Sequence, residues 1–300
     1  MAVVNGLGES VLTRPSEVRR LLESLGLRPS RALGQNFLVD AHVLATIVEV
    51  SCVGTADVVL EIGPGLGVLT EALVARARRV VAVEKDRRLE SHLRKRFAGV
   101  ANVELRFGDA LALDWPVLAK IGVTRLVSNL PYATGSAILA ELFRQSQGPA
   151  RVTVTLQLEV ARRLMAAPGS PHFGLLGVWA QADYDVTVVK VVSPTCFYPV
   201  PDVRSAVVVL ERRSKGRCPP EAKPLFFALT KRAFGQRRKQ LKAIFSGHGR
   251  GTIGVPADEA ILHMLGELDV DPTLRPEAVD SATWSALAAG LQRGQISWNA

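Results

Sequence analysis

The sequence predicts a two-domain α/β protein, in which a Rossmann-like sheet domain precedes a small all-helical domain. Short β-branched runs alternate with helical patterns over most of the chain, which is typical of βαβ units in a parallel sheet. A glycine-rich turn, Gly63-Pro64-Gly65-Leu66-Gly67, directly follows one of these runs. The β-rich runs stop at residues 213–224, a stretch rich in proline, glycine and charge.

The N-terminal part of the chain carries two predicted helices joined by a loop. Residues 15–27 have apolar side chains at helical spacing, with Ser16 placed to cap the start and Gly26 to end the helix. A second helical pattern covers residues 40–51, after the segment RALGQNFLVD. We therefore expect an N-terminal extension with a short helix over residues 1–30.

The central part of the chain supplies the strands and helices of the sheet domain. Each strand pattern is a short apolar run, and each helix pattern repeats apolar residues three or four positions apart. In chain order they are the strand 58–62, the helix 69–77, the strand 80–84, the helix 86–98, the strands 103–107 and 125–129, the helix 135–145 and the strand 151–157.

Two further β-rich runs, 185–192 and 205–212, lie too close together for a crossover helix between them. We expect them to pair antiparallel at the end of a mostly parallel sheet. The sheet domain then spans residues 31–212. Beyond it we predict a basic, helical domain over residues 213–300. Its helical patterns cover residues 225–245, 256–268 and 276–292.

The composition excludes several classes of protein. With 48% hydrophobic and 22% charged residues, the 300-residue chain is globular rather than disordered. No apolar run reaches the roughly 18 residues of a membrane helix, and the N-terminus lacks the pattern of a secretory signal. The three cysteines form no CxxC pair and the five histidines have no metal-ligand spacing. We expect a cytoplasmic, monomeric protein with no bound metal and no membrane contact.

The positive charge is concentrated in one segment. Residues 211–250 hold twelve Lys and Arg against two Glu, whereas residues 251–300 hold seven acids against two Arg. Such a local excess is typical of a surface that binds a polyanion, and we favour nucleic acid. The expected RNA contacts are Arg31, Lys231, Arg232, Arg237, Arg238, Lys239 and Lys242.

The glycine turn and two acidic residues predict a cofactor that carries adenosine. A dinucleotide-binding turn would need glycine at position 68, where this chain has Val68. Glu84 ends the next strand and can accept both hydroxyls of a ribose. Asp109, in Gly108-Asp109-Ala110 after the third strand, is placed to meet an adenine edge. This set fits S-adenosylmethionine better than NAD.

The turn Asn129-Leu130-Pro131-Tyr132 follows the fourth predicted strand of the sheet. Proline fixes the backbone, so the Asn129 side-chain oxygen and the Leu130 carbonyl can converge on one exocyclic amine. Two such acceptors orient the amine for attack on a sulfonium methyl group without a strong base. Tyr132 can stack on a base that has left its helix.

Together these motifs resemble the small-subunit rRNA adenine dimethyltransferase family, the KsgA type. The motifs are GQNFL (34–38), EIGPGLG (61–67), GDAL (108–111), NLPY (129–132), CFYPVPDVRSAVVVL (196–210) and AFGQRRKQL (233–241). The resemblance implies a class I methyltransferase fold. It also implies dimethylation of N6 on two adjacent adenosines in a hairpin loop near the 3′ end of 16S rRNA in the 30S subunit, with a role in ribosome biogenesis.

The resemblance also assigns roles to individual residues. It implies that Tyr132 and Phe197 sandwich the target adenine, so that Asn129, Leu130, Pro131, Tyr132 and Phe197 form the catalytic set. The expected contacts of S-adenosylmethionine are Asn36, Leu38, Gly63, Gly65, Gly67, Glu84, Asp109, Ala110 and Asn129.

Two other functions are open at this point. A macrolide-resistance type dimethylase, which modifies one adenosine of 23S rRNA, shares the QNFL, glycine-loop and NLPY elements. The CFYPVPDVRSAVVVL stretch and the helix at 15–27 favour the small-subunit assignment. A non-catalytic nucleic-acid-binding factor on the same scaffold is a third possibility, which the intact Gly63, Glu84 and Asp109 argue against.

Overall fold

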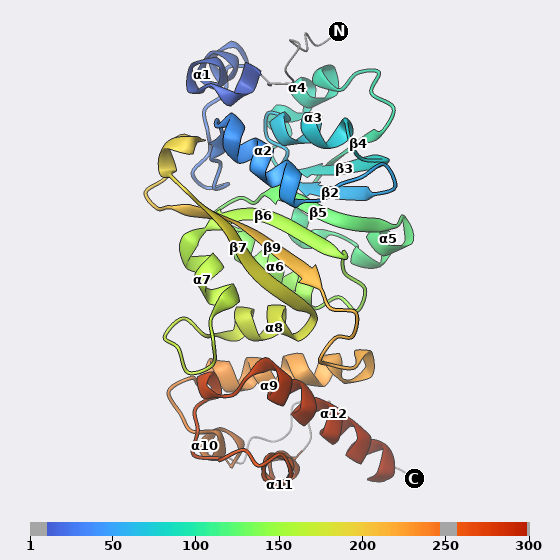
Figure 1. Cartoon of the computed structure of the whole chain (residues 1–300), viewed down its shortest axis with the longest axis vertical. Helices are drawn as coiled ribbons and strands as arrows, with labels where there is room; N and C mark the ends of the chain where they lie inside the picture. The colour runs from blue at the N-terminus through green and yellow to red at the C-terminus, as the bar shows by residue number, and fades with distance from the viewer. Residues whose placement is uncertain (1–10, 247–256, 299–300) are drawn as a thin grey trace. The chain divides into compact units, whose positions relative to one another are not determined.

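The computed structural model describes residues 11–246 and 257–298 (Figure 1). Residues 1–10 of the predicted extension lie outside the described residues, as do 247–256, which hold Arg250 and the start of the predicted helix 256–268. The chain forms two compact units. Unit 1 comprises Met1–Ala161 and Thr187–Glu211, and unit 2 comprises Arg162–Val186 and Arg212–Ala300. Unit 2 differs from the predicted helical domain in taking up residues 162–186, and the predicted domain limits stay a prediction.

A seven-stranded sheet of order β4-β3-β2-β5-β6-β9-β7 carries the fold. The strands are β2 (Val58–Ile62), β3 (Arg79–Glu84), β4 (Val103–Phe107), β5 (Val123–Asn129), β6 (Arg151–Gln157), β7 (Tyr184–Val192) and β9 (Ser205–Arg212). The strands from β4 to β6 run parallel, and β9 pairs antiparallel with β6 from Arg151↔Glu211 to Gln157↔Ser205. The mostly parallel sheet and the neighbouring β7 and β9 confirm the expected architecture.

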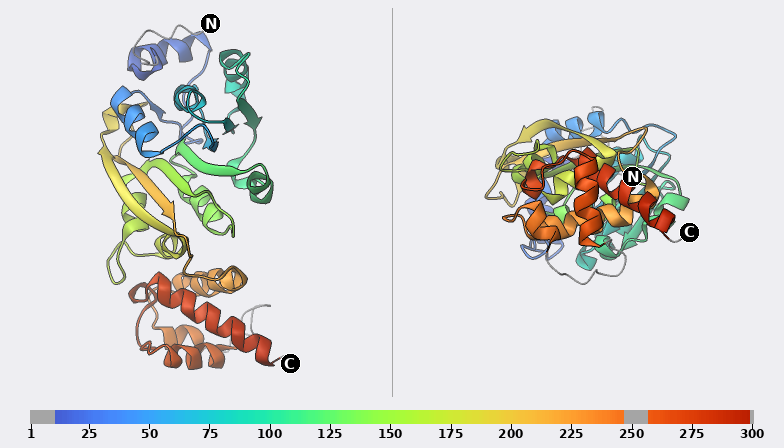
Figure 2. Two further views of the ribbon diagram at one scale, coloured as in Figure 1. Left: turned by 45° about the vertical axis from the view of Figure 1, so that its right-hand side comes forward. Right: turned by 90° about the horizontal axis from the view of Figure 1, so that it is seen from below.

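Helices cover both faces of the sheet in unit 1 (Figures 1 and 2). On one face the alternate strand residues Val59, Val80 and Val127 join a core with the helices α1 to α4. The helices of unit 1 are α1 (Pro15–Ser24), α2 (Ala41–Val50), α3 (Val68–Val74), α4 (Glu90–Arg96), α5 (Trp115–Lys120), α6 (Gly135–Phe143) and the first half of α7 (Leu158–Met165). The parallel strands therefore all end at one edge, where their connecting loops gather.

A second, two-stranded sheet joins distant parts of unit 1. Strand β1 (Phe37–Leu38) pairs antiparallel with β8 (Phe197–Tyr198), with Phe37 opposite Tyr198. It brings the GQNFL motif beside the CFYPVP motif. Single 3₁₀ turns complete the chain at Val11–Thr13, Arg87–Leu89, Ala110–Ala112, Pro194–Cys196, Pro220–Ala222 and Pro276–Ala278.

Unit 2 is helical around the buried side chain of Trp284. Its helices are α8 (Leu175–Asp183), α9 (Lys223–Gly235), α10 (Leu241–Phe245), α11 (Asp258–Glu267) and α12 (Ser281–Trp298). The buried indole N–H of Trp179 donates to the Thr230 hydroxyl at 2.9 Å, which ties α8 to α9.

The single helix predicted over residues 225–245 is wrong, because the structure breaks it between Gly235 and Leu241. Glycine weakens a helix interior, and three consecutive cations follow it at 237–239. The Leu241 N–H then donates to the Leu274 carbonyl at 2.8 Å instead of continuing the helix. Tertiary contacts therefore decide the break.

Candidate active site

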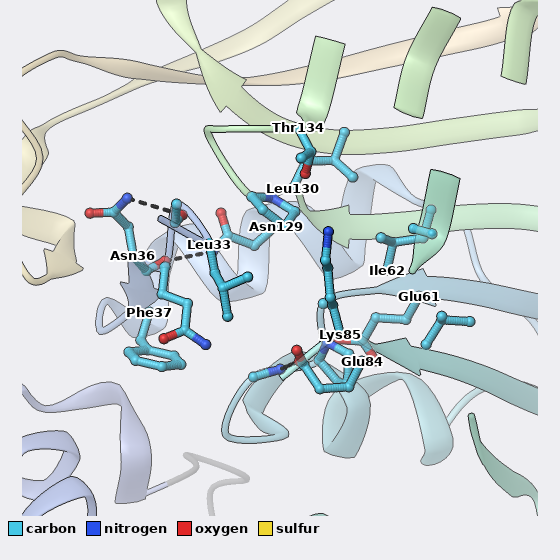
Figure 3. A pocket seen from close by; sticks show the side chains of 18 of the residues that line it. Leu33, Asn36, Phe37, Glu61, Ile62, Glu84, Lys85, Asn129, Leu130 and Thr134 are labelled. Carbon is cyan, nitrogen blue, oxygen red and sulfur yellow. Dashed lines mark hydrogen bonds between the residues drawn. The ribbon is translucent and has the colours of Figure 1, made fainter. Parts of the chain in front are cut away.

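A cleft opens in unit 1 at the carboxyl ends of β2, β3, β4 and β5 (Figure 3). Its free volume, counting the part open to solvent, is about 1100 Å³. Eight of the predicted cofactor contacts line it: Asn36, Leu38, Gly63, Gly65, Glu84, Asp109, Ala110 and Asn129. The ninth, Gly67, does not.

The glycine loop is held in a conformation that larger residues do not readily adopt. Gly63, Gly65 and Gly67 have φ values of 72°, 58° and 83°. A β-carbon at Gly65 would lie 3.1 Å from the Phe37 ring, and one at Gly67 would lie 2.8 Å from the ring of Phe97, the residue directly after α4. Gly67 therefore packs closely against the end of α4, whereas Gly63 and Gly65 face the cleft.

Glu84 supports the glycine loop and keeps capacity for a ligand. Its Oε2 accepts from the Gly65 N–H at 3.0 Å, and its Oε1 accepts from the Asp86 N–H at 2.8 Å. Burial raises the pKa of this carboxyl. Each carboxylate oxygen can accept a further hydrogen bond, so Glu84 is fixed in place and still able to accept ribose hydroxyls.

Asp109 is paired with a lysine that sequence reasoning missed. Lys85 also lines the cleft, and its Nζ donates to Asp109 Oδ2 at 2.7 Å. The hydrogen bond from Lys85 lowers the pKa of Asp109, so this carboxyl stays ionised. The Leu111 N–H donates to Oδ1 at 3.0 Å. The pattern gave no sign of Lys85, since a lysine after a strand is ordinarily a solvated side chain.

Glu61 is a second buried acid in the wall of the cleft. It is 1% exposed, and burial raises its pKa to about 8, with the nearby Glu84 adding to the effect. Within the part of the chain that the structure describes, its Oε2 has no hydrogen-bond partner. Sequence reasoning noted Glu61 only as part of the glycine motif.

The NLPY turn places one unpaired acceptor in the wall of the cleft. Asn129 Nδ2 donates to the Asn36 carbonyl at 2.9 Å, and Figure 3 shows the two residues approaching from opposite sides. This bond fixes which end of the amide faces away from Asn36. Asn129 Oδ1 is buried, and no described residue donates a hydrogen bond to it. An amine donor in the cleft would satisfy this oxygen.

The segment 30–38, which we call the strap, connects the two halves of the site. The Gly34 carbonyl accepts from the Tyr132 N–H at 3.3 Å, beside the Asn36–Asn129 bond. The side chain of the adjacent Gln35 contacts the β3 side of the site: its Nε2 donates to Asp86 Oδ2 at 2.8 Å, and its Oε1 accepts from the Ser30 N–H at 2.8 Å. Sequence reasoning missed Gln35 and Asp86, which lie 51 positions apart.

The two predicted base-stacking rings touch each other edge to face. The ring centres of Tyr132 and Phe197 are 6.2 Å apart, with an angle of 71° between their planes. Phe197 is 1% exposed, and the Tyr132 hydroxyl is hydrogen-bonded to the Ser205 hydroxyl. The predicted sandwich therefore requires the rings to separate, and it stays a prediction.

The predicted RNA contacts in unit 2 differ in their surroundings. Arg232 makes two bonds to the Asp258 carboxylate, at 2.6 and 2.9 Å, and its guanidinium lies over the Phe245 ring. Arg237 lies 3.6 Å from the Glu277 carboxylate. The remaining side chains are exposed: Lys231, Arg238, Lys239 and Lys242. Arg232 thus holds unit 2 together, whereas the exposed cations are available to a partner.

The sheet and its cleft define a class I methyltransferase, whose methyl donor is S-adenosylmethionine. The residues fit this cofactor. The carboxylate of Glu84 can accept hydrogen bonds from ribose hydroxyls, and Asn129 Oδ1 has no hydrogen-bond donor among the described residues. Among the described residues no helix is long and apolar enough to cross a bilayer. Nor does this part of the chain group three or more metal-ligating side chains.

Comparisons with known proteins identify the particular family. The model of the ribosomal RNA adenine dimethylase family matches residues 27–259. Two proteins named Ribosomal RNA small subunit methyltransferase A are close relatives. That of Deinococcus radiodurans is 39% identical over 93% of this chain and 91% of its own, and that of Phenylobacterium zucineum is 40% identical over 93% of each. The chain therefore belongs to the ribosomal RNA adenine dimethylase family.

Solved structures confirm the predicted fold class. A dimethyladenosine transferase from Plasmodium falciparum superposes with a TM-score of 0.71, at 24% identity, over 86% of this chain and 98% of that one. The 23S rRNA methyltransferase ErmE superposes with a TM-score of 0.61, at 25% identity, over 85% and 98%.

Proposed function

We propose that this enzyme transfers methyl groups to N6 of two adjacent adenosines in a hairpin loop near the 3′ end of 16S rRNA. The observation that carries the proposal is the buried, partnerless Oδ1 of Asn129 in the cleft of a ribosomal RNA adenine dimethylase. The relatives named for the small ribosomal subunit support the choice of 16S rRNA. The 30S subunit is then the partner, and the protein acts as a cytoplasmic monomer.

Bound S-adenosylmethionine supplies an electrophilic methyl group on sulfur. The protein's part is to orient the adenine amine. Asn129 Oδ1 and the Leu130 carbonyl accept from its two hydrogens, which directs the nitrogen lone pair out of the ring plane. The Leu130 N–H donates to the Thr155 carbonyl at 3.1 Å, which anchors the residue whose carbonyl is the second acceptor. Tyr132 and Phe197 hold the extruded base by stacking.

The decisive experiment compares 16S rRNA from cells with and without this protein, mapped for N6,N6-dimethyladenosine by mass spectrometry. The wild-type gene restores the two modified adenosines, and an Asn129→Ala variant does not, since its acceptor is lost. We expect this variant to bind 30S subunits within about threefold of wild type, because phosphate contacts dominate affinity.

The 23S dimethylase activity remains the rival outcome, given the structural similarity to ErmE. Purified 30S and 50S subunits, each unmethylated, are incubated with the enzyme and labelled cofactor. Label on 16S rRNA supports the proposal, and label confined to 23S rRNA overturns it. No label on either, together with RNA binding, would indicate a non-catalytic factor.

A further inference from the structure

The first helix of unit 1 and the residues on either side of it carry unpaired arginines. Helix α1 buries Val18 and Leu22, and Val18 lines the cleft together with Leu33 of the strap. Residues 14–31 hold five arginines against two glutamates. Arg20 pairs with Glu17 at 3.0 Å, while the others, Arg14, Arg19, Arg28 and Arg31, are exposed and have no carboxylate partner among the described residues.

The guanidinium of Arg19 lies over the ring of Tyr198, which is next to Phe197 in the chain. The guanidinium carbon lies 5.6 Å from the centre of the Tyr198 ring. Tyr198 is the second residue of β8, directly after Phe197, whose ring contacts Tyr132. Strand β8 therefore carries both a ring of the predicted target pocket and the ring beneath Arg19 of α1.

This surface fits RNA better than a membrane or a partner helix. The apolar face of α1 is already buried in the core of unit 1, so its exposed face is polar, and the excess positive charge lies in the residues on either side of it. An exposed guanidinium stacked on a ring is a platform on which an unpaired nucleobase can stack. The exposed arginines that follow α1 in the chain, Arg28 and Arg31, supply the charge that phosphates require.

We propose that Arg19 with the ring of Tyr198, flanked by Arg28 and Arg31, holds the single-stranded RNA next to the target adenosine. The inference rests on the proposed function and adds a second RNA-binding surface, in unit 1, to the basic segment of unit 2. The platform takes a flanking base, and the two other arginines take the phosphates on either side of it.

The test replaces all three arginines, as Arg19→Gln, Arg28→Gln and Arg31→Gln, in the full-length chain. Filter binding of unmethylated 30S subunits over a range of salt should show weaker binding. The slope of log affinity against log salt should fall by about 1.4, at roughly 0.7 for each of the two phosphate contacts with a single strand. Unchanged affinity and slope would overturn the inference.

The matched control removes three exposed cations from the opposite edge of the same sheet. Arg76 and Arg78 precede β3, and Lys120 precedes β5, so Arg76→Gln, Arg78→Gln and Lys120→Gln leave the cleft edge untouched. We expect wild-type 30S affinity from this variant. An equal loss of affinity in both triple variants would mean a non-specific charge effect and would overturn the surface.

Two single changes test the stacking platform separately from charge. Arg19→Lys keeps the charge but loses the planar guanidinium, and Tyr198→Leu removes the ring. Each should weaken 30S binding severalfold while leaving the salt slope as in wild type. Wild-type affinity in both would overturn the platform. Calorimetric affinity for S-adenosylmethionine should stay at the wild-type value in every variant, which confirms an intact unit 1.

The wild-type enzyme separates the two hypotheses. If it transfers no methyl group to 16S rRNA in 30S subunits, the proposed function fails. If it does, and the triple arginine variant binds and methylates 30S subunits as well as wild type, the function stands and only this surface fails.

Discussion

At the scale of single residues, the direction of the Asn129 amide is the feature on which the chemistry depends. A backbone carbonyl, that of Asn36, takes its Nδ2 and so leaves Oδ1 for the cleft. The strap that carries Asn36 is itself attached to Asp86, whose N–H donates to Glu84. Hydrogen bonds thus connect the expected ribose acceptor with the expected target acceptor through one short segment.

Replacing Gln35 tests this connection. Gln35→Glu puts a carboxylate against that of Asp86, whose pKa is lowered by its hydrogen bond from Arg88 and which therefore stays charged. Losing one buried hydrogen bond costs about 1–2 kcal/mol, so we expect roughly tenfold weaker cofactor binding in calorimetry, at full stoichiometry. We also expect a lower kcat at saturating cofactor.

A control for this change lies at the other edge of the sheet. The Thr124 hydroxyl donates to Asp57 at 2.7 Å, near the start of β5 and β2. Thr124→Val should lower the melting temperature but leave the cofactor Kd and kcat unchanged. Wild-type Kd and kcat in Gln35→Glu would mean that the strap contact is structural only.

Glu61 predicts a pH-dependent stability. Its pKa is raised from 4.5 to about 8, so the folded protein keeps a proton that the unfolded chain releases. This stabilisation is complete below the unfolded pKa and is lost as pH rises through the folded one. Urea unfolding between about pH 5 and pH 8 should show a steeper loss of stability in wild type than in Glu61→Gln. Parallel curves would mean that Glu61 is ionised in the folded protein.

At the scale of elements, the glycine loop depends on its packing against α4 as well as on its backbone angles. Gly67→Ala should cost about 1–2 kcal/mol for the left-handed backbone and more for the contact with Phe97, and should weaken cofactor binding. Gly99→Ala is the matched control, since Gly99 has a φ of 78° but nothing within 4 Å of a β-carbon. In urea unfolding, Gly99→Ala should lower the free energy of unfolding only by the backbone strain. Its cofactor Kd should equal that of wild type. Equal effects of the two changes would contradict a role for packing.

The elements that could be predicted are those whose apolar residues and flanking turn residues form a pattern within one short stretch of the sequence. Strands such as 58–62 and 80–84 are buried apolar runs, and the loops after them carry glycine or acid. Helix α8 was not predicted, because its sequence, LLGVWAQAD, is buried on nearly all sides and has no polar face. The sheet of β1 and β8 was not predicted either, because strands of two residues are too short to show an alternation of apolar and polar side chains.

The same limit applies to the site. Glu84 and Asn129 could be predicted because each ends a strand in a motif, whereas Lys85, Gln35 and Asp86 act through partners far along the chain. Arg232 is counted in the basic run, yet its guanidinium is taken up by Asp258. The sequence shows a charge but not the neighbour that neutralises it.

At the scale of the whole molecule, the Lys and Arg side chains fall into two groups, those paired with a carboxylate and those exposed to solvent. In unit 2, Arg238 and Lys239 are exposed after the end of α9, where the broken helix presents them in a turn. Because Gly235 and the bond between Leu241 and Leu274 set this turn, the break that the sequence missed also determines where the cations stand. We infer that this turn is the part of unit 2 that contacts rRNA phosphates.

Neutralising these two cations tests that inference. Arg238→Gln with Lys239→Gln should weaken binding to unmethylated 30S subunits and lower the salt slope by about 1.4–1.8, at 0.7–0.9 per contact. The cofactor Kd should stay unchanged, since neither residue lines the cleft. The control is Arg275→Gln with Arg293→Gln, two exposed arginines of the acidic stretch 251–300, which should bind 30S subunits like wild type. A loss in the control equal to that of the test pair would mean that net charge, and not the turn after α9, determines affinity.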